Sequence, residues 1–106
     1  MITAVFRKKD GVFCGFTVKG HSGYARHGSD IVCAAASSMV NLTVRLLEEG
    51  REEYSFCAEP EVPQTVLDLN NVTPFAGRVL SALYCELREL EAEYGGNLRI
   101  ITQEIQ

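Results

Sequence analysis

ITAVFRKKDGVFCGFTVKG, residues 2–20, holds two runs in which apolar and polar residues alternate, one on either side of Asp10-Gly11. Alternation with a period of two is the pattern of a half-buried strand. Asp-Gly is favoured in two-residue hairpin turns because both residues tolerate a positive φ there. The stretch therefore predicts an antiparallel hairpin with strands over 2–9 and 12–20.

A helix is predicted over residues 31–49, because apolar residues recur there every three or four positions and Gly50 follows as a stop signal. Its apolar residues form two stripes, one of Ile31, Ala35, Met39, Leu42 and Leu46 and another of Val32, Ala36, Val40 and Leu47. One stripe is expected to face the sheet. The other needs a cover, either from a second helix or from another subunit, so a homodimer is expected.

The rest of the chain predicts two more strands over 53–59 and 64–69, a second helix, and a last strand from Leu98. Thr73 suits the N-cap of that helix and Pro74 its first turn. Its apolar stripe consists of Phe75, Val79, Leu83, Leu87, Leu90 and Tyr94. The order ββαββαβ predicts an α+β two-layer sandwich, with two helices on a mixed or largely antiparallel sheet, in a single domain spanning 1–106.

The composition limits the partners of this domain. Apolar residues make up 46% of the chain, and 14 acidic against 10 basic side chains give a net charge of −4. This balance argues against direct contact with nucleic acid, which needs a basic surface, and suits a basic peptide better. The sequence begins without a signal-peptide pattern, and no stretch is expected to be long enough to span a membrane. We therefore expect a cytoplasmic protein with no membrane partner.

Four cysteines, Cys14, Cys33, Cys57 and Cys85, are scattered without a CxxC pair. This spacing argues against a zinc cluster and against a thioredoxin-like pair, so neither a metal nor a cofactor is expected. In a reducing compartment all four are expected as free thiols. Three of them, all except Cys33, are expected to pack as small apolar side chains.

Cys33 differs because it follows GHSGYARHGSD, a glycine-rich segment over 20–30, at the expected start of the helix. Asp30 suits the N-cap, which would place Cys33 in the first turn, where free backbone amides favour a thiolate. His21 is near enough in sequence for a turn of the segment to bring it to the thiol. Histidine and cysteine together predict nucleophilic catalysis, with the imidazole as acid and base.

The remaining residues of the segment allow simpler interpretations. His27 is expected to be a solvated loop residue, Asp30 serves equally well as a cap alone, and Ser37 suits close helix packing. Residues 20–23 also fit the GXXG pattern of KH domains. That interpretation is rejected, because the KH loop joins two helices and carries basic side chains.

Taken whole, the stretch resembles the ribosomal-processing cysteine protease (Prp) family of bacteria. The residues that match are Gly20-His21, Gly28, Asp30-Ile31-Val32-Cys33-Ala34-Ala35 and Ser37, with the spacing kept. The resemblance implies His21 as the catalytic histidine and Cys33 as the nucleophile, with Asp30 and Ser37 in supporting roles. It also implies a mobile substrate loop containing Gly20, Gly23 and Gly28. Ser22 and Ser29 depart from the residues common in the family.

The resemblance further implies a homodimeric cysteine endopeptidase of ribosome biogenesis. Members of the family remove an N-terminal extension from the precursor of a large-subunit ribosomal protein, number twenty-seven. The alternative is a non-catalytic module that binds the ribosome or a ribosomal protein, with Cys33 merely packed. A redox sensor is a third alternative, but it would need a resolving cysteine closer to Cys33.

Overall fold

The computed structural model describes residues 1–20, 27–59 and 61–106, with the backbone alone at 27–30. Its elements follow the order ββαββαβ. In sequence they are β1 (Ile2–Lys9), β2 (Val12–Lys19), α1 (His27–Glu49), β3 (Tyr54–Glu59), β4 (Gln64–Leu69), α2 (Pro74–Tyr94) and β5 (Leu98–Glu104). Each of the predicted strands and helices is present.

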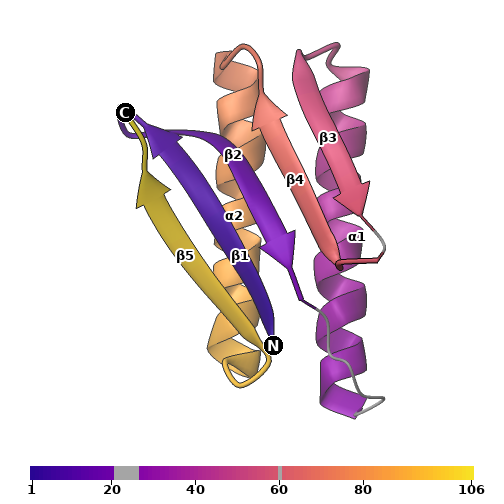
Figure 1. Ribbon diagram of the computed structural model, residues 1–106. Helices are drawn as coiled ribbons and strands as arrows, with labels where there is room; N and C mark the ends of the chain where they lie inside the picture. Colours follow the sequence, from indigo (N-terminus) through magenta and orange to yellow (C-terminus); the bar gives the residue numbers. More distant parts are fainter. Residues whose placement is uncertain (21–26, 60) are drawn as a thin grey trace.

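The strands form one mixed sheet in the order β3-β4-β2-β1-β5. The pairs β1–β2, β2–β4 and β3–β4 are antiparallel, whereas β1 and β5 are parallel. Both helices cover the same face, with α2 behind β1 and β2 and α1 behind β3 and β4 (Figure 1). The predicted α+β two-layer sandwich is therefore confirmed.

The turn of the first hairpin has the expected geometry. Asp10 and Gly11 have φ values of 54° and 79°, which is the pair of positive angles that a type I′ turn requires. The register shifts once, between Arg7 and Lys8. Beyond this bulge the pairing places Ala4 and Phe6 of β1 on the buried face of the sheet.

The two apolar stripes of α1 have different surroundings. Val32, Ala36, Val40 and Leu47 are buried against the sheet and α2. On the second stripe, Ile31, Leu42 and Leu46 are exposed, and Leu42 has the largest exposed fraction, 58%. The prediction that one stripe covers the sheet is confirmed, and the other stripe lacks a cover among the described residues.

Helix α2 begins and ends where its sequence predicts. The Thr73 side chain accepts a hydrogen bond of 3.1 Å from the Ala76 N–H, and the helix ends at Tyr94, before Gly95. The buried face consists of Ala76, Val79, Leu80, Leu83 and Leu87. Phe75, placed in the apolar stripe by the sequence, is instead exposed and lies beside the uncovered stripe of α1.

A side-chain bond joins α1 to β3. The Tyr54 hydroxyl donates to the Glu48 carboxylate. This bond, with a smaller contribution from burial and from the Glu48 charge, raises the pKa of Tyr54 above its usual value. It fixes the C-terminal end of α1 over the start of β3, whereas the described side chains in the N-terminal half of the helix make no such bond to the sheet.

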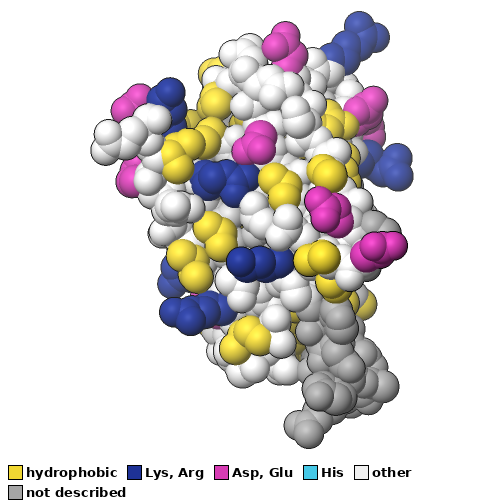
Figure 2. Space-filling view, in the orientation of Figure 1, with side chains coloured by type: hydrophobic (Ala, Val, Ile, Leu, Met, Phe, Trp, Pro, Cys, Tyr) yellow, Lys and Arg dark blue, Asp and Glu magenta, His cyan; other side chains and the backbone are white. Residues whose placement is uncertain are grey.

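The face of the sheet away from the helices is open. Lys and Arg side chains lie over its middle strands, and acidic side chains lie over the end of β3 (Figure 2). Arg7 connects three strands there, because it donates to Thr17 at 2.7 Å and to Asp68 at 3.0 Å. Its ion pair with Asp68 leaves less free positive charge on this face.

The expectation that no stretch of the chain is long enough to span a membrane is wrong. Residues Ile31–Glu49 of α1 are long and apolar enough to cross a membrane by length and composition alone. The core helix of a soluble domain passes the same test, and one side of this helix packs on the sheet through Val32, Ala36 and Val40.

Candidate active site

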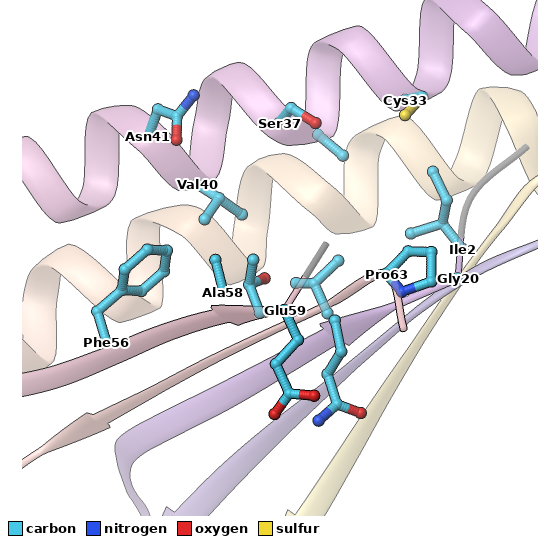
Figure 3. Close-up of a pocket in the computed structure, with 14 residues that line it drawn as sticks. Ile2, Gly20, Cys33, Ser37, Val40, Asn41, Phe56, Ala58, Glu59 and Pro63 are labelled. Atoms are coloured by element: carbon cyan, nitrogen blue, oxygen red, sulfur yellow. The ribbon is translucent and has the colours of Figure 1, made fainter. Parts of the chain in front are cut away.

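A cleft lies between the N-terminal half of α1 and strands β2, β3 and β4, with a volume of about 510 Å³. Figure 3 shows residues of the helix on one side and residues of the strands opposite them. The lining residues are Ile2, Val18, Gly20, Cys33, Ala36, Ser37, Val40, Asn41, Phe56, Ala58, Glu59, Pro63, Gln64 and Thr65. Most of this lining is apolar, and the volume lies in the range of pockets that bind small ligands or short peptide segments.

Cys33, the predicted nucleophile, lines this cleft. It is half-buried and packs against the hydrophobic core while its sulfur faces the strands (Figure 3). Ser37 lies one turn further along α1 and lines the same cleft. The structure therefore brings together two of the residues selected from the sequence.

The surroundings of Cys33 differ from the prediction in one respect. Because α1 begins at His27, Asp30 is its fourth residue rather than its N-cap, and Cys33 is its seventh residue. Only the first four N–H groups of a helix lack an intrahelical acceptor. Cys33 thus lies in the second turn, and its own N–H belongs to the helix ladder. The prediction of Asp30 as the N-cap, with Cys33 in the first turn of the helix, is wrong.

The helix starts early for a reason visible in the sequence. Aspartate is favoured both at an N-cap and within the first turn, where the helix dipole stabilises negative charge. Asp30 therefore suits its observed position as well as the predicted one. The earlier start also places Gly28 and His27 in α1, so the prediction that both belong to a loop is wrong.

Gly20 occupies the mouth of the cleft and requires glycine. Its φ is +89°, and an added Cβ would lie 2.4 Å from the Met1 carbonyl oxygen. Its N–H donates to the Pro63 carbonyl at 2.9 Å. The end of β2, the N-terminus and the segment before β4 are thus in contact at the residue that precedes His21.

His21 and Gly23, the other two residues selected from the glycine-rich segment, lie outside the described residues. The same holds for the Asp30 side chain. Cys33, Ser37 and Gly20 are the selected residues that the described part of the structure places in one cleft.

Asn41 and Phe56 are cleft residues that the sequence analysis missed. Asn41 follows Cys33 and Ser37 at a spacing of four, so helical periodicity was a signal for it. Phe56 lies on β3 and is directed toward α1 (Figure 3). Phe56 lines the cleft because of the order of the strands in the sheet. The local sequence around Phe56 does not predict that order.

The other three cysteines lie outside this cleft. Cys14 is half-buried and donates to the Arg7 carbonyl, whereas Cys57 and Cys85 are exposed. The prediction that Cys57 and Cys85 pack inside the protein is wrong. All four cysteines are unpaired, and the described residues contain no group of His, Cys, Asp and Glu side chains that could hold a metal ion.

Known proteins are similar to this chain both in sequence and in fold. The profile of the family "Cysteine protease Prp" matches residues 1–99. The ribosomal processing cysteine protease Prp of Bacillus subtilis is 27% identical over 99% of this chain and all of its own. That of Mycoplasma genitalium is 31% identical over 81% of this chain and 84% of its own.

A solved structure has the same architecture. The essential ribosomal processing protease Prp from S. aureus, in complex with a substrate peptide, superposes with a TM-score of 0.90 at 23% identity. The match covers 97% of this chain and all of that one. With the apolar cleft and the cysteine that lines it, these likenesses show that the chain belongs to the ribosomal processing cysteine protease Prp family.

Proposed function

We propose that this protein is a cysteine endopeptidase that removes the N-terminal extension of large-subunit ribosomal protein number twenty-seven, with His21 and Cys33 as its dyad. One observation carries the proposal: Cys33 lines an apolar cleft that begins at Gly20, the residue before His21. A half-buried thiol that is merely packed needs no such cleft beside it.

The proposed reaction uses two groups. The Cys33 thiolate attacks the scissile carbonyl carbon and forms a carbon–sulfur bond. Collapse of this adduct breaks the carbon–nitrogen bond, and the His21 imidazolium gives its proton to the departing amine. Water then attacks the thioester, His21 takes the proton of that water, and the thiolate leaves. No cofactor or metal takes part in this scheme.

Supporting roles are proposed for two further residues. Ser37 lies one turn beyond Cys33 on the same cleft wall, within reach of the peptide that Cys33 attacks. Asp30 lies three positions before Cys33 in α1 and is proposed to orient the imidazole. Because the Cys33 N–H is committed to the helix, His21 rather than the helix terminus supplies the main activation of the thiol.

The cleft also suits the proposed substrate. Its apolar lining includes Val18, Val40 and Phe56, which favours apolar substrate side chains. Glu59 lies at the rim, and the acidic side chains over the end of β3 favour a basic ribosomal protein beyond that point (Figure 2). The chain is proposed to act in the cytoplasm as one protease domain, without a membrane or nucleic-acid partner.

A second copy of the chain is the proposed cover for the exposed stripe. Ile31, Leu42 and Leu46 of α1 and Phe75 of α2 are exposed large apolar side chains. Leu42, Leu46 and Phe75 line a shared groove of about 280 Å³ between the two helices. This groove lies on the far side of α1 from Cys33, so a homodimer would leave the cleft open. Self-association is preferred because the groove has little charge, with Arg78 and Glu86 at its edge.

The test of function is cleavage of a peptide that spans the extension and the start of the ribosomal protein, with the products identified by mass. The wild-type protein is expected to make a single cut. Cys33→Ala is expected to abolish it, while Cys57→Ala, which removes an exposed thiol outside the cleft, is expected to retain it. Equal cleavage by Cys33→Ala would contradict the proposal, and binding without cleavage by the wild type would favour the non-catalytic module.

A further inference from the structure

Strand β3 forms the edge of the sheet beside the cleft. Among residues 1–20, 27–59 and 61–106, β4 is the strand that pairs with β3, in a register without a shift from Tyr54↔Leu69 to Glu59↔Gln64. Edge strands are commonly protected by a bulge, a proline or lysines, because their unpaired backbone groups attract other strands. The sequence YSFCAE of β3 has none of these and carries one charge, at Glu59.

The hydrogen-bond pattern shows which backbone groups of β3 lack a partner among the described residues. The Glu53 carbonyl accepts a bond of 2.9 Å from the Asn70 N–H, one step before the Tyr54↔Leu69 pair. Bonded and non-bonded pairs alternate along an antiparallel ladder. Counting by two from Glu53, the bonded pairs are those of Ser55, Cys57 and Glu59. Phe56 and Ala58 therefore fall in non-bonded pairs, and their N–H and C=O groups are directed away from β4.

Phe56 and Ala58 also line the cleft with their side chains. Phe56 pairs with Leu67 of β4, yet 38% of Phe56 is exposed whereas Leu67 is fully buried. The cover that α1 gives to β3 is therefore incomplete at Phe56, where the cleft separates the helix from the strand. Free backbone groups and an apolar wall occur together at the same two residues.

The cleft has the length of a short extended peptide. Cys33 and Asn41 line it along α1 and are eight residues apart, which corresponds to about 12 Å at 1.5 Å per residue. An extended chain advances about 3.3 Å per residue, so this distance fits roughly three to four residues. Ala58 and Glu59 line the same cleft as Cys33, so a chain lying along β3 continues toward the thiol.

We propose that the substrate binds as an added strand along the free edge of β3, with alternate side chains in the cleft and its scissile bond at Cys33. This binding mode rests on the proposed function. Backbone bonds to Phe56 and Ala58 supply affinity without regard to sequence, and the apolar cleft selects side chains two residues apart. The other edge strand, β5, lies across the sheet from α1 and does not line this cleft (Figure 1).

The first test uses a set of extension peptides, each with one N-methylated backbone amide, and the Cys33→Ala protein to measure dissociation constants without cleavage. Strand addition predicts that methylation weakens binding about tenfold at two positions separated by one tolerant position, because each lost hydrogen bond costs about that factor. Uniform effects across the peptide, or losses at consecutive positions, would overturn it.

The second test compares Ala58→Pro with Ala58→Val in the otherwise wild-type enzyme. Both add carbon atoms to the same side chain, but only proline removes the N–H that faces the free edge. Proline is expected to raise KM about tenfold relative to valine, with kcat and the melting temperature nearly equal. Equal KM values would overturn strand addition, and if the proline variant does not fold, the methylation pattern decides.

These outcomes separate the two proposals. If the wild type cleaves the unmodified peptide while methylation shows no alternation, strand addition fails and the protease assignment stands. If the wild type neither cleaves nor binds that peptide, the proposed function fails first, and strand addition fails with it.

Discussion

Gly20 and Pro63 are joined by a hydrogen bond of 2.9 Å from the Gly20 N–H to the Pro63 carbonyl, at the mouth of the cleft that Cys33 lines. The bond ties the end of β2 to the segment before β4. It fixes the position of Gly20, the residue that precedes His21 in the chain.

Replacing Gly20 by alanine should therefore reduce activity strongly. The positive φ of 89° and the approach of the Met1 carbonyl to 2.4 Å both oppose a Cβ, so the backbone must shift. We expect kcat/KM for the extension peptide to fall more than tenfold and stability to fall by about 1–3 kcal/mol. Gly96→Ala is the matched control, because nothing lies within 4 Å of the Cβ it adds. Equal losses in the two variants would contradict a specific role for Gly20.

The two histidines should differ in their effect on catalysis. His21→Ala is expected to lower kcat by at least about a hundredfold, the usual scale of general acid–base catalysis. His27→Ala, at the first residue of α1, is expected to keep most of the activity. Peptide cleavage by both variants measures the difference. A large loss with His27→Ala and none with His21→Ala would reverse the assignment.

The exposed stripe of α1 predicts the assembly state. Leu42→Glu places a charge on the uncovered apolar surface and should convert a dimer into monomers. Arg45→Glu, also exposed on α1 but outside the groove that Leu42 lines, should leave the dimer intact. Light scattering after gel filtration gives the mass of each variant. A monomeric wild-type protein would refute the proposed dimer.

The bond between Tyr54 and Glu48 predicts a pH dependence of stability. Because the folded state raises the pKa of Tyr54 above its usual value, the stabilising effect is complete below about pH 10 and is lost as the pH rises through the raised pKa. Tyr54→Phe should cost less than about 1 kcal/mol at pH 7, since the bond is exposed. In urea unfolding, the gap between wild type and variant should close above pH 10. A gap that widens there would contradict this assignment.

Local sequence was sufficient for most of the fold. The Asp10-Gly11 turn, the Thr73 cap and the alternation in each strand are set by residues close together in the chain, and all are present in the structure. The start of α1 was predicted late because an aspartate suits both an N-cap and a first turn, so Asp30 does not distinguish between the two.

The site was predictable only in part. Cys33 carries its signal in its own neighbourhood, and Ser37 and Asn41 follow it with helical spacing. Phe56 and Pro63 reach the cleft because β3 and β4 pair with each other and β4 pairs with β2. That order depends on contacts between segments far apart in sequence, for which local periodicity carries no information.

The central claim is that Cys33 attacks the scissile bond of the ribosomal-protein extension. The most direct measurement treats the native protein with an extension peptide ending in a chloromethyl ketone at the scissile position, and locates the adduct by intact mass and peptide mapping. The account predicts one adduct per chain, on Cys33, that excess unmodified peptide prevents. Labelling of the exposed Cys57 or Cys85 in place of Cys33, or labelling unaffected by the competing peptide, would contradict it.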